Sequence, residues 1–155
     1  MKLNSIFVDT AAILGLFKPN DYLKEISKTI LAELLDDYDV NLVTTNWVQY
    51  EALSALKQFG FEYCERFSRF IDKDILKVYR INKQYELKGL QTFWRYKDKA
   101  WGIVDCTSME FMFSNSLIYV FTDDNDFAQA GLLKLITSDK SGTPIKNYSM
   151  LSFFE

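Results

Sequence analysis

Short apolar segments alternate with amphipathic segments along almost the whole chain, and this alternation constrains the fold most. Residues 22–35 carry apolar side chains at spacings of three and four, as in a helix that packs one face against a sheet. Residues 5–8 form a short, β-prone apolar run, which is typical of a parallel strand buried on both faces. The repeated alternation predicts an α/β fold with a mostly parallel sheet.

The spacing of apolar residues predicts strands or helices over most of the chain. The predicted strands are residues 5–8, 40–44, 75–81, 117–121 and 133–137. The predicted helices are residues 10–16, 22–35, 44–59, 61–73, 82–96, 103–113 and 126–130. From Asp139 onward we expect a turn and then an apolar end that packs on the protein or on a partner, containing Met150, Leu151, Phe153 and Phe154. The length suits one domain over residues 1–155.

Composition limits the chemistry and the location of the protein. The chain has no histidine, and Cys64 and Cys106 lie in apolar helical contexts, where we expect reduced packing residues. No apolar run approaches the roughly 20 residues that span a bilayer. The start of the chain does not resemble a signal peptide, so we expect a cytoplasmic protein with no membrane association.

A net charge of −3 argues against a general nucleic-acid binder, but the charge is unevenly spread. Residues 61–99 carry 10 basic against 6 acidic side chains, residues 1–60 carry 5 against 8, and residues 100–155 carry 3 against 7. On charge alone, the basic segment fits a solvated helix face and a polyanion-binding surface equally well. The candidates for phosphate contact are Arg66, Arg69, Arg95, Lys97 and Lys99.

Four acidic residues lie within or next to apolar segments of the predicted strands and helices. Asp9 follows the run 5–8, Asp124 follows the run 117–121, Asp105 lies near the start of the helix 103–113, and Glu51 lies within the helix 44–59. A carboxylate near a core must be paired, hydrogen-bonded or metal-bound, because an isolated buried charge is costly. Since ligands bind at the carboxyl ends of parallel strands, the four acids are expected to converge there.

Oxygen ligands without histidine or thiolate suit a hard cation such as Mg²⁺ or Mn²⁺. Such an ion orients and deprotonates a water and neutralises charge on a phosphate under in-line attack. The four acids therefore predict a divalent-metal site for phosphodiester hydrolysis.

Four segments of the chain resemble the acidic motifs of the PIN-domain ribonucleases, in particular the VapC-type toxins of toxin–antitoxin systems. The segments are residues 7–10 (FVDT), 44–51 (TTNWVQYE), 96–106 (YKDKAWGIVDC) and 122–131 (TDDNDFAQAG). The resemblance extends from residue 6 to about residue 136. It implies a three-layer α/β/α sandwich around a five-stranded, mostly parallel sheet.

The resemblance also implies a function. The expected activity is an Mg²⁺- or Mn²⁺-dependent endoribonuclease that leaves 5′-phosphate and 3′-hydroxyl ends, with Asp9, Glu51, Asp105 and Asp124 as catalytic and metal-binding residues. The expected substrate is tRNA or another structured RNA, held by Thr10, Thr122, Arg95, Lys97 and Lys99. The expected partners are a cognate antitoxin and a second copy of the chain in a homodimer.

Two positions depart from the family pattern. Gly102 replaces the usual Ser three residues before the third acid, and Asp126 replaces a frequent His before Phe127. Glycine is an acceptable helix cap but supplies no hydroxyl, and we expect Asp126 to cap the helix 126–130. Within residues 123–126 we expect Asp124 to face the metal and Asp123 to point away. Residues two apart in an extended segment share a face, so Asp124 lies on the same face as Thr122.

Two other classes of function remain open. One is a catalytically silent PIN-like module that binds RNA or a protein, to which the departures at Gly102 and Asp126 give some weight. Metal-dependent RNA cleavage separates it from the nuclease. A phosphoacceptor receiver domain shares the fold class but needs a second acid beside Asp9, which is flanked by Val8 and Thr10. Among Trp47, Trp94 and Trp101, at least two are expected in the core rather than stacked on bases.

Overall fold

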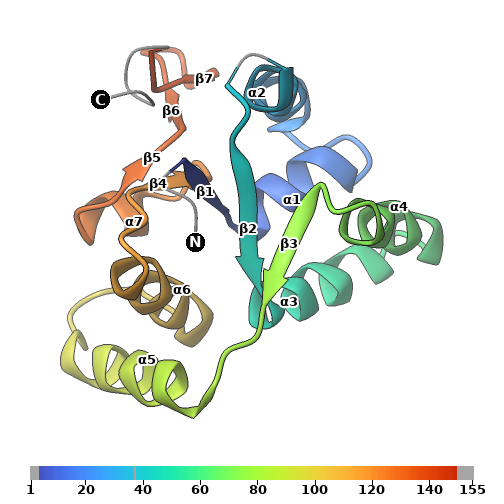
Figure 1. Cartoon of the computed structure of the whole chain (residues 1–155). Helices are drawn as coiled ribbons and strands as arrows, with labels where there is room; N and C mark the ends of the chain where they lie inside the picture. Colours follow the sequence, from blue (N-terminus) through green and yellow to red (C-terminus); the bar gives the residue numbers. More distant parts are fainter. Residues whose placement is uncertain (1–3, 37, 150–155) are drawn as a thin grey trace.

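A computed structural model describes residues 4–36 and 38–149 of the chain. Its centre is a parallel sheet with the strand order β3-β2-β1-β4-β5, flanked by helices (Figure 1). The strands are β1 (Ser5–Val8), β2 (Asn41–Thr45), β3 (Leu76–Tyr79), β4 (Tyr119–Phe121) and β5 (Leu133–Lys134). The predicted α/β class and the five-stranded sheet are confirmed.

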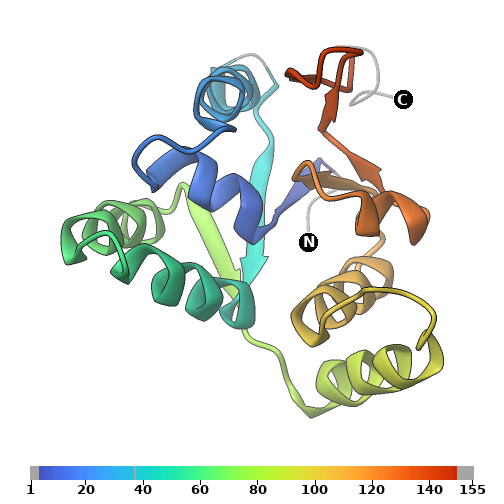
Figure 2. The same cartoon turned by 180° about the vertical axis from the view of Figure 1, so that it is seen from behind.

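The helices are close to the predicted segments. They are α1 (Thr10–Phe17), α2 (Lys24–Asp36), α3 (Asn46–Lys57), α4 (Phe61–Asp72), α5 (Lys83–Arg95), α6 (Ile103–Ser114) and α7 (Asn125–Gln129). Side chains set two of the helix starts: Thr45 accepts a hydrogen bond from the Val48 backbone, and Asn82 accepts one from the Tyr85 backbone. Seen from behind, α1 to α4 lie together, while α5 and α6 pack as a separate pair (Figure 2).

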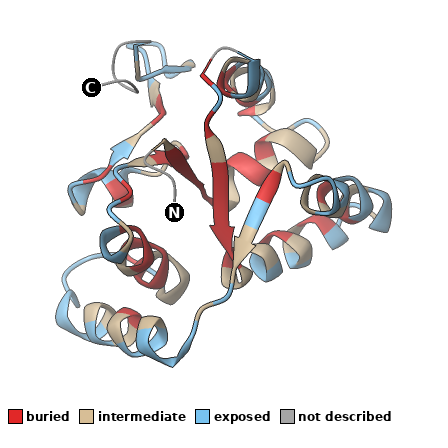
Figure 3. Cartoon of the chain, viewed as in Figure 1, coloured by how far each residue is buried: buried red, intermediate tan, exposed pale blue. Residues whose placement is uncertain are grey.

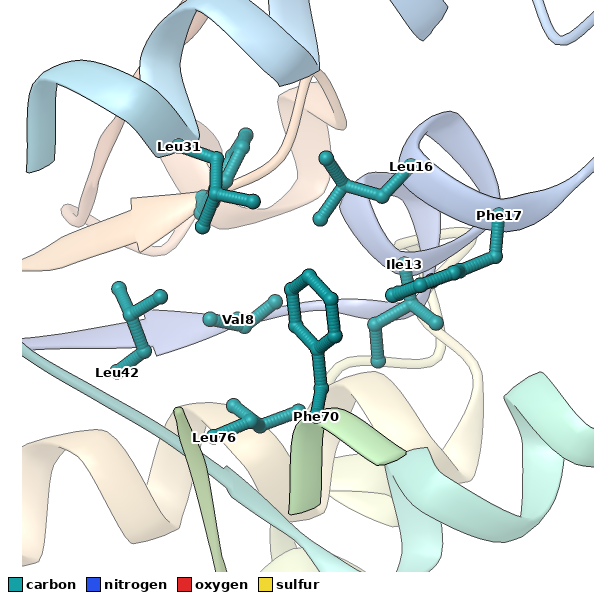
Figure 4. A pocket seen from close by; sticks show the side chains of 9 residues that line it. Val8, Ile13, Leu16, Phe17, Leu31, Leu42, Phe70 and Leu76 are labelled. Carbon is teal, nitrogen blue, oxygen red and sulfur yellow. The ribbon is translucent and has the colours of Figure 1, made fainter. Parts of the chain in front are cut away.

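The alternation of side chains along β1 separates the two faces of the sheet. Phe7 packs against Phe111 of α6, with ring centroids 5.9 Å apart. Val8 faces the other way, toward Leu16 of α1 and Phe70 of α4 (Figure 4). The space left between these apolar side chains is about 10 Å³, at most enough for a single water, so this layer is packed core rather than a ligand site.

Burial follows the position of each strand in the sheet. All four residues of β1 are buried, and so are four of the five in β2, which lie in the red centre of Figure 3. Cys64 and Cys106 are buried and unpaired, as expected of packing residues. In the part of the chain that the structure describes, no helix is long and apolar enough to cross a membrane.

The C-terminal region differs from the prediction of one strand over residues 133–137. β5 ends at Lys134, and the chain turns into β6 (Ile136–Ser138), which pairs antiparallel with β7 (Pro144–Lys146). Asp139 closes this hairpin by accepting hydrogen bonds from the backbones of Ser141 and Thr143. The apolar end that contains Met150, Leu151, Phe153 and Phe154 lies outside the described residues.

The hairpin is attached to α2 through one carboxylate. Glu33 accepts hydrogen bonds from Lys146 Nζ at 2.6 Å and from the Tyr148 hydroxyl at 2.5 Å. These two bonds, the Lys146 bond first, lower the pKa of Glu33. The hairpin therefore extends the fold beyond the edge strand β5 and is held by a polar contact with α2.

Candidate active site

Asp9 is the most deeply buried of the four predicted acids. It directly follows β1 and is only 5 % exposed. Thr122 donates a hydrogen bond from Oγ1 to Asp9 Oδ2 at 2.8 Å. The pKa of Asp9 is raised to about 7, mainly by burial and to a smaller extent by the charges of Asp105 and Asp124, while the hydrogen bond from Thr122 opposes the rise. Asp9 is therefore a carboxyl group held beside other acids at the end of the central strand.

Thr122 connects the ends of β1 and β4. Its Oγ1 donates to Asp9 and accepts a hydrogen bond from the Asp124 backbone at 3.2 Å. Asp124 in turn caps α7, because its Oδ1 accepts a hydrogen bond from the Asp126 backbone at 2.9 Å. The prediction that Asp126 caps this helix is wrong: α7 begins at Asn125, so the last extended residue before it is Asp124.

Asp105 lies in the first turn of α6. Gly102 is the N-cap of this helix, as expected, and its backbone N–H donates to Asp105 Oδ2 at 3.2 Å. The pKa of Asp105 is raised to about 6, mainly by burial and then by the charges of Asp124, Asp126 and Glu51, while the hydrogen bond from the Gly102 backbone opposes the rise. The start of α6 thus brings a carboxylate next to those at the start of α7.

Three carboxylates form the closest group in the site. Asp105, Asp124 and Asp126 each offer an oxygen, and these three atoms lie within 4.8 Å of one another. We call these residues the acid cluster. The sequence motifs predicted Asp105 and Asp124 at this site but not Asp126, for which the only signal was the density of acids in residues 123–126.

Glu51 lies at the edge of this site. It is exposed on α3, and its Oε1 accepts a hydrogen bond from Thr10 Oγ1 at 2.6 Å. Its charge contributes to the raised pKa of Asp105. Since the charges of Asp105 and Asp124 also act on Asp9, the four predicted acids converge on one region, although Asp9 and Glu51 are not in the closest group.

Asp123 lies outside the acid cluster, as the alternation of the extended segment predicted. Its Oδ2 accepts a hydrogen bond from the Tyr22 hydroxyl at 2.5 Å, and its backbone carbonyl accepts one from Lys134 Nζ. Burial, followed by the bond to Asp123, raises the pKa of Tyr22. The Tyr22 ring is nevertheless 70 % exposed, so an aromatic surface lies beside the fourth motif.

The basic candidates are more dispersed. Arg95 ends α5, and Lys97 and Lys99 follow it on the exposed connection to α6. Arg66 and Arg69 lie on α4. Among the residues described, no ion pair joins any of these cations to the acid cluster; Arg66 pairs with Glu62 and Lys99 with Asp98, each at 3.8 Å. Their assignment to phosphate contact stays a prediction.

The three tryptophans occupy different environments. Trp101 is 8 % exposed, Trp47 is half-buried and Trp94 is 63 % exposed. Lys97 Nζ lies 5.9 Å from the centre of the Trp94 ring. Trp94 is therefore the tryptophan that is open to a ligand.

The donor set fits a hard divalent cation. The charged side chains shown above to converge here, Asp9, Glu51, Asp105, Asp124 and Asp126, are all carboxylates, and oxygen donors of this kind suit Mg²⁺ or Mn²⁺. The raised pKa values of Asp9 and Asp105 reflect burial and mutual repulsion, both of which a bound cation offsets. A groove of about 440 Å³ between α1, α2 and α4 has no acidic residue in its lining and is distinct from this site.

A comparison with known protein families identifies the family of the chain. The family model of the PIN domain matches residues 6–133, and the chain belongs to this family. The order 3-2-1-4-5 also differs from the 2-1-3-4-5 order of receiver domains, which excludes that alternative.

One solved structure similar to this chain is that of Mycobacterium tuberculosis VapC20, described as a sarcin-ricin loop cleaving toxin. The two share 21 % sequence identity with a TM-score of 0.74, over 83 % of this chain and 96 % of VapC20. At this identity the likeness concerns the fold. A search of curated protein sequences found no significant match.

Proposed function

We propose that the protein is a metal-dependent endoribonuclease and the toxin of a toxin–antitoxin pair. The observation that carries this proposal is the convergence of carboxylates at the carboxyl ends of β1 and β4, in a chain of the PIN domain family. The similarity to VapC20, a sarcin-ricin loop cleaving toxin, supports it.

Carboxylates of the chain are the proposed metal ligands. Asp9, Asp105 and Asp124 are the proposed ligands for Mg²⁺ or Mn²⁺, and Asp126 adds a carboxylate to the same group. When bound, the cation supplies activation of a water and neutralisation of charge on the attacked phosphate. Thr122 fixes Asp9 and the segment before Asp124 through its two hydrogen bonds.

Glu51 has a different role from the three proposed metal ligands. Thr10 fixes its Oε1, and Oε2 is left to accept a proton from the attacking water. Its exposure at the edge of the site suits a group that meets solvent and substrate. Arg95, Lys97 and Lys99 offer positive charge for the RNA backbone along the connection between α5 and α6. The proposed substrate is a structured RNA such as tRNA, the proposed partners are an antitoxin and a second copy of the chain, and the proposed location is the cytoplasm.

RNA cleavage by the purified protein tests the proposal. Incubation of tRNA and of a ribosomal RNA fragment with Mg²⁺ or Mn²⁺ is expected to give discrete products with 5′-phosphate and 3′-hydroxyl ends, and EDTA is expected to prevent cleavage. Asp9→Asn should be inactive. Asp123→Asn is the matched control, because it makes the same chemical change outside the acid cluster and should cleave. Equal cleavage by the wild type and Asp9→Asn, or cleavage in EDTA, would count against the nuclease.

A further inference from the structure

We propose that a cavity between α5, α6 and α7 binds one unpaired nucleobase of the RNA, beside the acid cluster. The cavity has a volume of about 180 Å³ and is lined by aromatic, acidic and amide side chains. This inference rests on the proposed function for the identity of the ligand as RNA. It assigns a base-binding site to residues that have no part in metal binding.

Three short stretches of chain connect the lining of the cavity with the acid cluster. Trp101, in its wall, precedes the N-cap residue that donates to Asp105. Met109 lies one helical turn after Asp105 along α6, and Gln129 lies three residues after Asp126 along α7. An RNA strand whose phosphate lies at the acid cluster therefore has a neighbouring base within reach of the cavity.

Two aromatic rings provide a stacking surface. The Tyr96 and Trp101 rings lie 5.0 Å apart at 46°. Trp101 is held in place by its indole N–H, which donates to Gln129 Oε1 at 3.2 Å. Tyr96 is 38 % exposed, whereas Trp101 is only 8 % exposed, so Tyr96 is the ring that a base can cover. Unpaired bases stack on aromatic side chains in this way in many RNA-binding proteins.

The polar groups of the cavity suit a base rather than a phosphate. Glu110 Oε1 accepts the Thr92 hydroxyl at 2.6 Å, which leaves Oε2 as an acceptor for N–H groups of a base. Gln129 uses its oxygen for Trp101, which leaves its amide N–H groups as donors. The Glu110 carboxylate repels phosphate, while Lys99 lies in the lining with a cation for the RNA backbone.

The volume limits the occupant to one ring system. A cavity of about 180 Å³ is smaller than the roughly 300 Å³ and more of pockets for drug-sized ligands. A base with N–H donors beside a carbonyl, as in guanine, satisfies both Glu110 and Gln129. Ribose and phosphate then lie outside, toward Lys99 and the acid cluster.

Titration of the metal-free protein with the four nucleoside 5′-monophosphates, followed by NMR at the Trp101 indole N–H, tests the proposal. The signal is assigned with the Trp101→Phe variant. Saturable shifts are expected at this N–H with at least one nucleotide, whereas ribose 5-phosphate and inorganic phosphate should leave it unchanged. The absence of a shift with all four nucleotides at millimolar concentration, or an equal shift with ribose 5-phosphate, would overturn the proposal.

Variants locate the binding site. Tyr96→Ala is expected to weaken nucleotide binding by roughly tenfold, and Glu110→Gln to reduce the preference among the four bases. Phe61→Ala is the matched control, since Phe61 is an exposed aromatic residue on α4 and should leave the titration unchanged. Binding that survives Tyr96→Ala contradicts the proposal. Because the titration needs neither metal nor cleavage, its outcome is independent of whether the protein proves to be a nuclease.

Discussion

Replacing Asp9 with asparagine is expected to stabilise the metal-free protein at pH 8 and to leave its stability at pH 4 nearly unchanged. The pKa of Asp9 is raised from 3.8 to about 7 in the folded protein, mainly by burial. The folded state therefore binds a proton that the unfolded state has released, and the free energy of unfolding falls as the pH rises from about 4 to about 7. Asparagine carries no charge at any of these pH values and can still accept the Thr122 hydrogen bond.

The size of the effect follows from the pKa. A difference of about three pH units at about 1.4 kcal/mol each gives about 4 kcal/mol above pH 7. For a chain of this length that corresponds to an increase of roughly 10 °C in melting temperature. Thermal melts of the wild type and Asp9→Asn in EDTA between pH 4 and pH 8 measure it. Saturating Mn²⁺ should raise the melting temperature of the wild type but not of the variant.

One outcome would contradict the raised pKa of Asp9. If Asp9→Asn is destabilised equally at pH 4 and pH 8, the ionised Asp9 carboxylate does not destabilise the metal-free fold. Asp123→Asn provides the control for metal dependence, because Asp123 contacts Tyr22 outside the acid cluster, and this variant should keep the wild-type response to Mn²⁺.

Three further predictions concern other positions. Gly102→Ser should fold, gain a few tenths of a kcal/mol in stability and keep or increase RNA cleavage, since an added Cβ meets only a carboxylate oxygen at 3.6 Å. A folded variant with clearly lower activity would show that glycine is needed there. Asp124→Asn should reduce RNA cleavage by orders of magnitude in single-turnover assays while keeping the α7 cap. Asp124→Ala should lose the cap as well, and with it about 1 kcal/mol of stability. An active Asp124→Asn protein would exclude Asp124 as a ligand. Gly89→Ala should lower the free energy of unfolding, measured by chemical denaturation, by about 1–3 kcal/mol, because its Cβ would lie 2.9 Å from the Thr107 Cα. The exposed control Gln91→Ala should change this free energy by less than about 0.5 kcal/mol. Equal effects of the two substitutions would refute the close α5–α6 packing.

The sequence predicted the sheet and the convergence of the acids because both depend on local patterns. The apolar run 5–8 is short and buried on both faces, as found for β1. Asp9 directly follows that strand, and Asp124 lies on the extended segment that follows β4, so the parallel sheet brings them together. The register at residues 122–127 was also predictable, since alternation along an extended segment separates Asp123 from Thr122 and Asp124.

Other features depend on contacts that local patterns do not contain. Asp124 and Asp126 are both good capping residues, and only the point where the chain leaves β4 decides that Asp124 caps α7. That same choice places Asp126 in the acid cluster. The apolar run 133–137 reads as one strand, but its second half pairs with Pro144–Lys146, a partner that the run itself does not specify.

Anomalous diffraction from crystals soaked in Mn²⁺ would show whether these acids bind metal. We expect a manganese peak at the acid cluster, about 2 Å from carboxylate oxygens of Asp105 and Asp124 and with Asp9 in its coordination shell. The peak should be absent from crystals of Asp124→Asn grown under the same conditions. Manganese bound only elsewhere on the protein, or equally in the variant, would contradict the assignment of these acids as a metal site.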